Sequence, residues 1–174
     1  MTITLYDATV PSYLQTLAAA QGVLARGLAH CEATGLDPES LVETRLAPDM
    51  HPLRFQAVSV MHHSLNALDA LASGGFSPPP DLGPLDYAGL QALLAEAQAK
   101  VSAIAPDAVN GAADKAVEFR RDGRVMMRFA AADFLLSFSL PNFYFHATTA
   151  YDILRMKGVP LGKRDFLGAL RIER

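Results

Sequence analysis

The feature that most constrains this fold is the recurrence of apolar residues at helical spacing through four long segments of the 174-residue chain. These segments are expected at about 10–34, 50–72, 86–105 and 131–157. Each has one apolar face and no core of its own, so the four faces must bury against one another. The sequence therefore predicts an all-α fold, with the four helices packed as an up-and-down four-helix bundle in one domain that covers residues 1–174.

Proline, glycine and capping residues place the ends of these helices. Pro11 and Pro52 are expected in the first turns of the first and second helices, and Pro141 as a kink inside the last one. Gly35 is expected to end the first helix, and Asp86 to cap the third. In the connector after the first helix, residues 38–42 are predicted to form a short helical turn and residues 45–50 an extended segment.

The periodicity changes between the third and fourth helices. Residues 115–120 and 124–129 both alternate, and Asp122-Gly123 lies between them. Asp-Gly between alternating segments is a strong signal for a tight hairpin turn. We therefore expect a small β-hairpin before the last long helix, lying against the helices because an isolated hairpin is only marginally stable.

Charge and cysteine usage limit the partners and the compartment. The net charge is -3 and the basic residues are scattered, which argues against a nucleic-acid partner. No uncharged apolar run reaches the roughly 18 residues of a membrane helix, and the N-terminus shows no signal-peptide pattern. Cys31 is the only cysteine, expected as a small buried residue. These features predict a cytoplasmic protein.

Polar residues on otherwise apolar helix faces indicate a site. Buried polar groups must find hydrogen-bond partners, so they point either at a ligand or at an internal network. Two of them are seven residues apart on the second helix, and two are four apart on the last. Pockets between facing helices are where bundles bind ligands. The candidate pocket residues are Gln56, His63, Asn142 and His146, with Tyr144 and Tyr151 as further candidates.

Each of these residues also has a purely structural interpretation. His146 can be a buried imidazole with two hydrogen-bond partners inside the protein. His62 and His63 are adjacent, so one of them is expected to face solvent. Gln56 can cap the backbone groups of a neighbouring loop. The whole polar set can serve only to fix the register of the helices.

Residue types disfavour a transition-metal site. The chain contains no His-x-x-x-His or His-Glu-x-x-His pattern, and carboxylates on the inner faces are scarce. Asn and Gln amides are weak ligands for zinc or nickel. Asp69 and Asp152 are the nearest carboxylate candidates, and both are expected to be solvated.

The most distinctive segments resemble a bacterial family of unknown function allied to the DinB/YfiT-like superfamily of proposed metalloenzymes. The resemblance covers essentially the whole chain. It rests on Leu140-Pro141-Asn142-Phe143-Tyr144-Phe145-His146, Tyr151, Leu154-Arg155, Gly158-Val159-Pro160-Leu161-Gly162-Lys163, Asp165-Phe166-Leu167-Gly168, Ala47-Pro48-Asp49-Met50-His51-Pro52-Leu53 and Phe55-Gln56.

The resemblance implies an up-down-down-up four-helix bundle with a crossover connection, often a homodimer. The superfamily binds a divalent metal through one histidine on the second helix and a His-x-x-x-His pair on the last long helix. Some branches are thiol-dependent transferases and others have no known activity. When this metal-binding pattern is carried over to the present sequence, the His-x-x-x-His pair corresponds to Asn142 and His146. The ligand on the second helix corresponds to a position near Gln56 or, less well, to His63. At most two of the three metal ligands are therefore present.

Two functional hypotheses follow. The first is a homodimeric protein that binds a small molecule in the polar pocket and has no complete metal triad and no cofactor. The alternative is a hydrolase or thiol transferase of DinB/YfiT type that depends on a divalent ion (nickel, zinc or manganese) held by His63 and His146. Whether the protein is an enzyme stays open at this stage.

Overall fold

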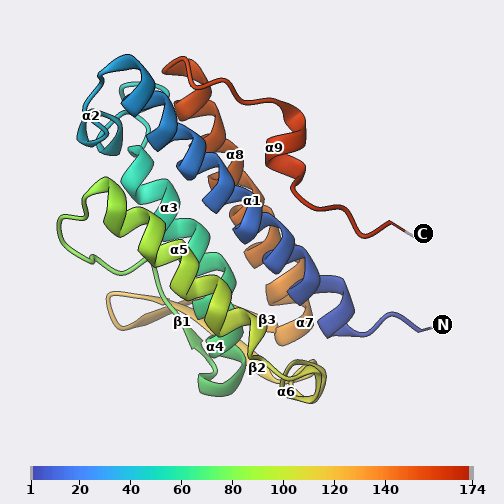
Figure 1. Ribbon diagram of the computed structural model, residues 1–174. Helices are drawn as coiled ribbons and strands as arrows, with labels where there is room; N and C mark the ends of the chain where they lie inside the picture. The colour runs from blue at the N-terminus through green and yellow to red at the C-terminus, as the bar shows by residue number, and fades with distance from the viewer. Residues whose placement is uncertain (1, 173–174) are drawn as a thin grey trace.

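A computed structural model of the protein describes residues 2–172. Four long helical stretches lie side by side in Figure 1, and α1 and α8 run in the opposite direction to α3 and α5. The protein is mostly helical with a small sheet, as the sequence predicts. The long stretches are α1 (Leu5–Thr34), α3 (Leu53–Met61) with η1 (His62–Asn66) and α4 (Ala67–Ser73), α5 (Tyr87–Ser102), and α7 (Ala131–Asp133) with η2 (Phe134–Ser139) and α8 (Leu140–Met156). Shorter helices are α2 (Glu39–Val42), α6 (Pro106–Asn110) and α9 (Lys163–Leu167).

Helix α1 begins five residues before its predicted start. Thr4 and Asp7 form a capping box, in which the Thr4 hydroxyl accepts from the Asp7 N–H and the Asp7 carboxylate accepts from the Thr4 N–H. Pro11 consequently lies in the second turn and not in the first. The predicted C-terminal stop is confirmed, because Gly35 adopts a left-handed conformation with φ of 71°.

Some local expectations need correction. Pro52 precedes the first turn of α3 and is its N-cap residue, in an extended conformation. Residues 45–50 are not extended, since a hydrogen bond from the Met50 N–H to the Ala47 carbonyl closes a turn. Asp86 caps α5 as predicted, by accepting from the Gly89 N–H at 2.7 Å.

The sheet contains the predicted hairpin and one further short strand. Strands β2 (Ala116–Arg121) and β3 (Arg124–Ala130) are antiparallel. Asp122 and Gly123 connect them with φ of 51° and 75°, the positive values that a tight type I′ turn requires. Strand β1 (Gly75–Phe76) pairs in parallel with β2, where the sequence predicts only a loop. Two residues are too few to show a periodicity of their own.

The last long helix is irregular just before Pro141. Proline has no N–H to donate to the carbonyl four residues earlier, so a regular α-helical bond to Ser137 cannot form. The helix is π-helical over Phe134–Ser139 and becomes α-helical from Leu140. Where the sequence predicts a kink at Pro141, the structure thus has a change of helix type.

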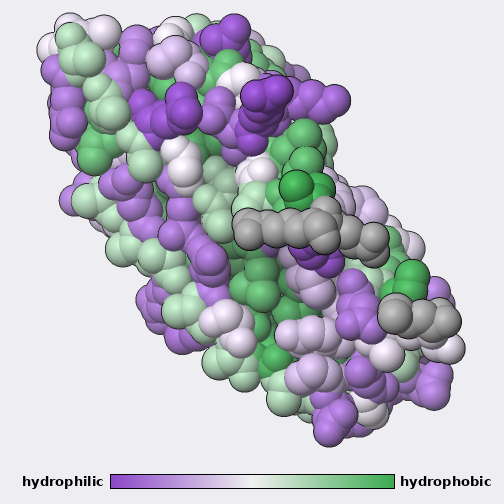
Figure 2. Space-filling model, turned by 45° about the vertical axis from the view of Figure 1, so that its right-hand side comes forward, coloured by the Kyte–Doolittle hydropathy of each residue, from purple (hydrophilic) through white to green (hydrophobic). Residues whose placement is uncertain are grey.

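The core lies between the long helices and under the sheet. Its largest fully buried side chains include Tyr13, Tyr87, Phe134 and Phe143. Figure 2 shows the face that carries both ends of the described chain, where polar and apolar side chains are interspersed and apolar ones gather near those ends. Within residues 2–172, no helix combines the length and the apolar character needed to cross a bilayer.

Candidate functional site

A cavity of about 780 Å³ lies where the second helix, the sheet and the last helix meet. The segment from His51 through η1 forms one wall, and η2 with the start of α8 forms another. Strand β1, the prolines after it and the turn end of the hairpin complete the lining. The volume is within the range that is usual for small-molecule sites.

Both π-helical segments border this cavity. Segment η1 contributes His62 and His63, and η2 contributes Phe138. A π-helical turn contains more residues than an α-helical turn, so neighbouring side chains point in more similar directions. The prediction that one of the two adjacent histidines faces solvent is wrong, because His62 is only 3% and His63 only 6% exposed.

A buried chain of hydroxyl groups supports the backbone of η1. The Ser139 hydroxyl donates to the carbonyl oxygen of His63 at 2.6 Å. Because the Ser139 hydroxyl has only this one proton to donate, the Tyr13 hydroxyl must be the donor in its own hydrogen bond with Ser139 Oγ, also at 2.6 Å. Helices α1 and η2 thus hold the carbonyl of His63 in place.

The tautomer of His146 follows from two further hydrogen bonds. Gln56 Nε2 donates to the His51 carbonyl at 2.8 Å, which turns Gln56 Oε1 towards His146. Since Oε1 only accepts, His146 Nδ1 carries the hydrogen and donates to it at 2.8 Å. His146 Nε2 is then the unprotonated nitrogen of the ring, available as an acceptor on a residue that lines the cavity.

His62 has partners for both ring nitrogens. Its Nε2 lies 2.8 Å from the carbonyl oxygen of Ser77, which can only accept. Its Nδ1 therefore accepts from the Asn66 side chain at 3.0 Å. The ring also stacks on Phe76, with centroids 4.2 Å apart. His62 thereby ties the segment after β1 to the helix.

His63 differs from His62 in having an unused nitrogen. Its Nδ1 is buried and has no hydrogen-bond partner among the residues that the structure describes. Its ring lies nearly parallel to that of His146, with centroids 5.7 Å apart. An unpaired buried nitrogen costs free energy of folding.

The three imidazoles are neutral at pH 7. Burial, together with the neighbouring His62 and His146, lowers the pKa of His63 to about 3. Burial also lowers the pKa of His62 and of His146 to about 4. These three rings therefore bring no positive charge to the cavity at pH 7.

The structure brings together four of the six candidate residues. His63, Asn142 and His146 line the cavity, and Gln56 lies behind His146 as its hydrogen-bond partner. Gln56 also makes the backbone contact that its structural interpretation anticipates.

Tyr144 and Tyr151 do not line the cavity. Tyr144 is 39% exposed, and Tyr151 packs against Phe166 of α9 with centroids 6.1 Å apart. Both aromatic side chains lie on other faces of α8.

Sequence reasoning missed several lining residues. Phe76 and Phe119 come from the strands, and Arg120 and Arg121 from the end of β2. The alternation of the hairpin was visible in the sequence, and so was its Arg-Arg pair. The parallel pairing of β2 with β1 was not visible in the sequence. This pairing brings the hairpin to the helices beside η1.

These residues do not fit a three-ligand metal site. Within residues 2–172, no group of three or more His, Cys, Asp or Glu side chains is arranged to hold an ion. Both amide atoms of Gln56 are already paired, and Asn142 Nδ2 donates to the Phe138 carbonyl at 2.7 Å. Two imidazoles and one amide oxygen fall short of the usual donor set.

Comparison with known proteins gives the family of the chain. Residues 5–167 match the model of a domain of unknown function, DUF1993, so the chain belongs to this family. The fold is similar to the crystal structure of a DinB family member protein from Shewanella denitrificans, with a TM-score of 0.80 and 25% sequence identity. The match covers 98% of this chain and 95% of that one. No curated protein matches the chain.

Proposed function

We propose that the protein binds a small molecule in the cavity between the second helix, the sheet and the last helix. The observation that carries the proposal is the unprotonated Nε2 of His146 on the wall of a cavity of about 780 Å³, where the hydrogen bond to Gln56 fixes the hydrogen on Nδ1. A purely structural histidine would have both nitrogens paired inside the protein, as His62 does, whereas His146 has only Nδ1 paired.

The architecture that we propose for the long helices is the up-down-down-up bundle with a crossover connection, as a single domain. We also propose a homodimer located in the cytoplasm. The fold similarity to a DinB family member supports the bundle, and the single buried cysteine suits a reducing compartment.

A thermal-shift screen against a broad metabolite library tests the binding function. A ligand at about 100 times its Kd stabilises the native state by roughly 2.7 kcal/mol, which raises the Tm by about 5–10 °C in a domain of this size. The variant His146→Ala should lose most of that shift. The variant Tyr151→Phe, on the same helix but away from the cavity, should keep it.

Two results would contradict the proposal. One is a library in which no compound raises the Tm of the wild-type protein. The other is a set of hits whose shifts are the same in His146→Ala and in the wild type. Metal analysis of protein purified without a tag and without added metal tests the hydrolase or transferase alternative, which requires a stoichiometric divalent ion.

A further inference from the structure

The turn end of the hairpin brings positive charge to the cavity. Strands β2 and β3 with their turn contain four arginines against two carboxylates, a net charge of +2 in a chain whose total is -3. Among residues 2–172, Asp122 is the only acidic residue of the cavity lining, whereas Arg120 and Arg121 both belong to it.

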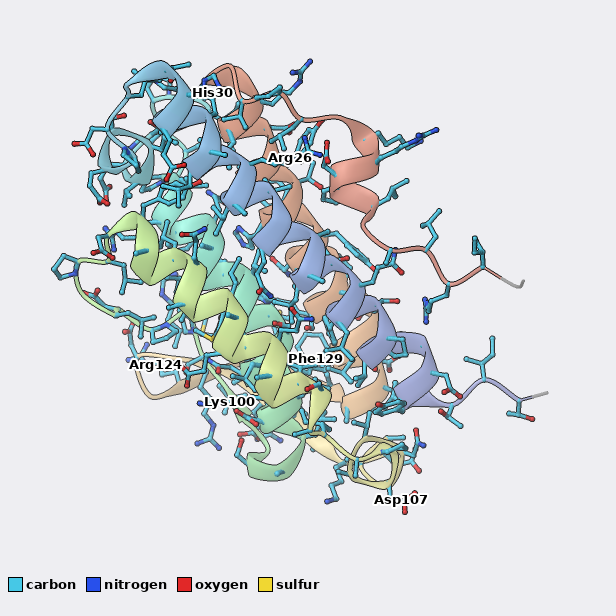
Figure 3. The ribbon with its side chains drawn as sticks, viewed as in Figure 1. Arg26, His30, Lys100, Asp107, Arg124 and Phe129 are labelled. Carbon is cyan, nitrogen blue, oxygen red and sulfur yellow. The ribbon has the colours of Figure 1, made fainter. Side chains whose placement is uncertain are left out.

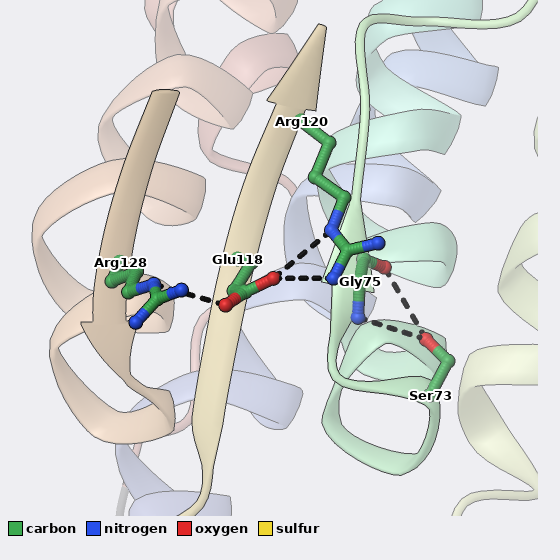
Figure 4. A network of polar contacts seen from close by, with 5 residues as sticks. All are labelled: Ser73, Gly75, Glu118, Arg120 and Arg128. Carbon is green, nitrogen blue, oxygen red and sulfur yellow. Dashed lines mark hydrogen bonds and ion pairs between the residues drawn. The ribbon is translucent and has the colours of Figure 1, made fainter. Parts of the chain in front are cut away.

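These arginines are only partly compensated by carboxylates. Glu118 pairs with both Arg120 and Arg128, each with a guanidinium nitrogen about 3.0 Å from the carboxylate, so one negative charge serves two positive ones (Figure 4). The Arg121 guanidinium lies 3.9 Å from the Asp122 carboxylate, and both side chains are largely exposed. An exposed pair at this distance is weak, so Arg121 can turn to another anion.

The remaining walls of the cavity are largely aromatic. The ring of Phe138 lies 6.1 Å from Phe76, 5.6 Å from Phe119 and 5.8 Å from His63, measured between centroids. Phe55 lies against His146 at 5.8 Å. Flat rings in such surroundings gain stacking and edge-to-face contacts that a saturated molecule of equal size does not.

The hydrogen-bonding groups of the wall complete the description of the ligand. His146 Nε2 is an acceptor, because the chain from the His51 carbonyl through Gln56 fixes the hydrogen on Nδ1. A ligand therefore satisfies it with an O–H or N–H donor. An anionic group on the same molecule would face the arginines at the hairpin end.

We infer that the cavity selects a planar aromatic or heteroaromatic acid that carries a hydrogen-bond donor. This inference rests on the proposed small-molecule function and adds the chemical class to it. The acid group lies at the hairpin turn with Arg121, the ring lies among the phenylalanines, and the donor reaches His146 Nε2.

Matched probes separate the three contributions. The probe 6-hydroxy-2-naphthoate has the ring, the donor and the acid, its carboxamide lacks the charge, and 2-naphthoate lacks the hydroxyl donor. Binding is measured by NMR titration of the histidine ring signals. We expect the acid to bind at least about fivefold more tightly than the carboxamide, and this ratio to fall as NaCl is added.

Two arginine variants give a matched control. Arg121→Gln removes a guanidinium that lines the cavity and should lower the affinity for the acid about threefold, with little effect on the carboxamide. Arg124 lies on the other side of the turn, at the tip of the hairpin (Figure 3). Arg124→Gln removes the same charge there and should change the affinity for the acid less than twofold.

The possible results test the aromatic-acid inference and the proposed small-molecule function separately. Equal binding of acid and carboxamide, or equal effects of Arg121→Gln and Arg124→Gln, overturns the aromatic-acid inference and leaves a small-molecule site. Absence of binding by every probe also overturns this inference, while hits of other chemistry in the metabolite screen would still support the proposed function. A screen without any hit overturns both.

Discussion

Gln56 determines which nitrogen of the His146 ring carries the hydrogen. Its amide joins the His51 carbonyl to His146 Nδ1 through two hydrogen bonds of 2.8 Å. No other described residue provides a hydrogen bond to that nitrogen.

Replacement of Gln56 by Met should free the His146 ring. Met has a similar size but leaves the His51 carbonyl and His146 Nδ1 without their partner. We expect a loss of about 1–3 kcal/mol in the free energy of unfolding, measured with urea. The ¹⁵N signals of the His146 ring should shift towards a mixture of tautomers. An unchanged single tautomer in Gln56→Met would contradict the assignment.

The hydroxyl chain from Tyr13 to His63 gives a second prediction at the scale of single residues. Ser139→Ala removes the hydroxyl that both donates to the His63 carbonyl and accepts from Tyr13, so two buried groups lose their partner. We expect it to cost about 1–3 kcal/mol, and more than Tyr13→Phe does.

A double-mutant cycle tests whether the three groups are coupled. In the Ser139→Ala background the Tyr13 hydroxyl is already unpaired, so its removal by Tyr13→Phe should cost little or stabilise the protein. Additive effects of the two substitutions in urea unfolding would show that the hydroxyls act independently.

At the scale of elements, helix α1 contains two glycines with opposite surroundings. A Cβ at Gly27 would collide with the Tyr87 hydroxyl and lie 3.4 Å from Leu154, whereas a Cβ at Gly22 has no neighbour within 4 Å. The Tyr87 hydroxyl donates to the Leu24 carbonyl at 2.8 Å and joins α5 to α1. The absence of a side chain at Gly27 thus leaves the space that the Tyr87 hydroxyl occupies.

The two glycine substitutions should change stability in opposite directions. Gly22→Ala removes backbone freedom from the unfolded chain and should stabilise the protein by about 0.5–1 kcal/mol. Gly27→Ala should destabilise it by about 1–3 kcal/mol, because Tyr87 must move and lose its hydrogen bond. Urea unfolding of both variants measures the difference, and the same sign for both would contradict the packing of α5 on α1.

The elements that the sequence predicts are those with long periodic patterns or strong local signals. The four long helices, the Asp122-Gly123 hairpin and the Gly35 stop are confirmed. The start of α1 and strand β1 could not be read in the same way. The first depends on the capping box of Thr4 and Asp7, which precedes the periodic pattern, and the second on pairing with a strand about forty residues away.

The candidate site was predicted only where it depends on helix faces. The convergence of His63, Asn142 and His146 follows from spacing, because residues four or seven apart share one side of a helix. The burial of both His62 and His63 does not follow, because it depends on the π-helical turn. The arginines at the cavity were missed because their approach to the helices depends on the β1–β2 contact.

At the scale of the whole molecule, the neutral imidazoles link stability to pH. His62, His63 and His146 are packed in or beside the core with pKa values of about 4, 3 and 4, against 6.5 for an ordinary histidine. Below pH 6.5 the unfolded chain therefore binds protons that the folded chain does not. Stability is fully present above that pH and is lost as the pH falls towards 4.

This linkage predicts a steep loss of stability in mildly acidic buffer. Each imidazole contributes a slope of up to about 1.4 kcal/mol per pH unit, so the free energy of unfolding should fall by several kcal/mol between pH 7 and pH 5. Asp7, Glu96 and Glu118 act in the same direction, because hydrogen bonds from Thr4, Lys100 and Arg120 lower their pKa values. Urea unfolding at both pH values measures the loss. His63→Met removes one of the three groups and should reduce this loss of stability by about a third. A free energy of unfolding that is constant from pH 7 to 5 would show that burial does not hold these rings neutral.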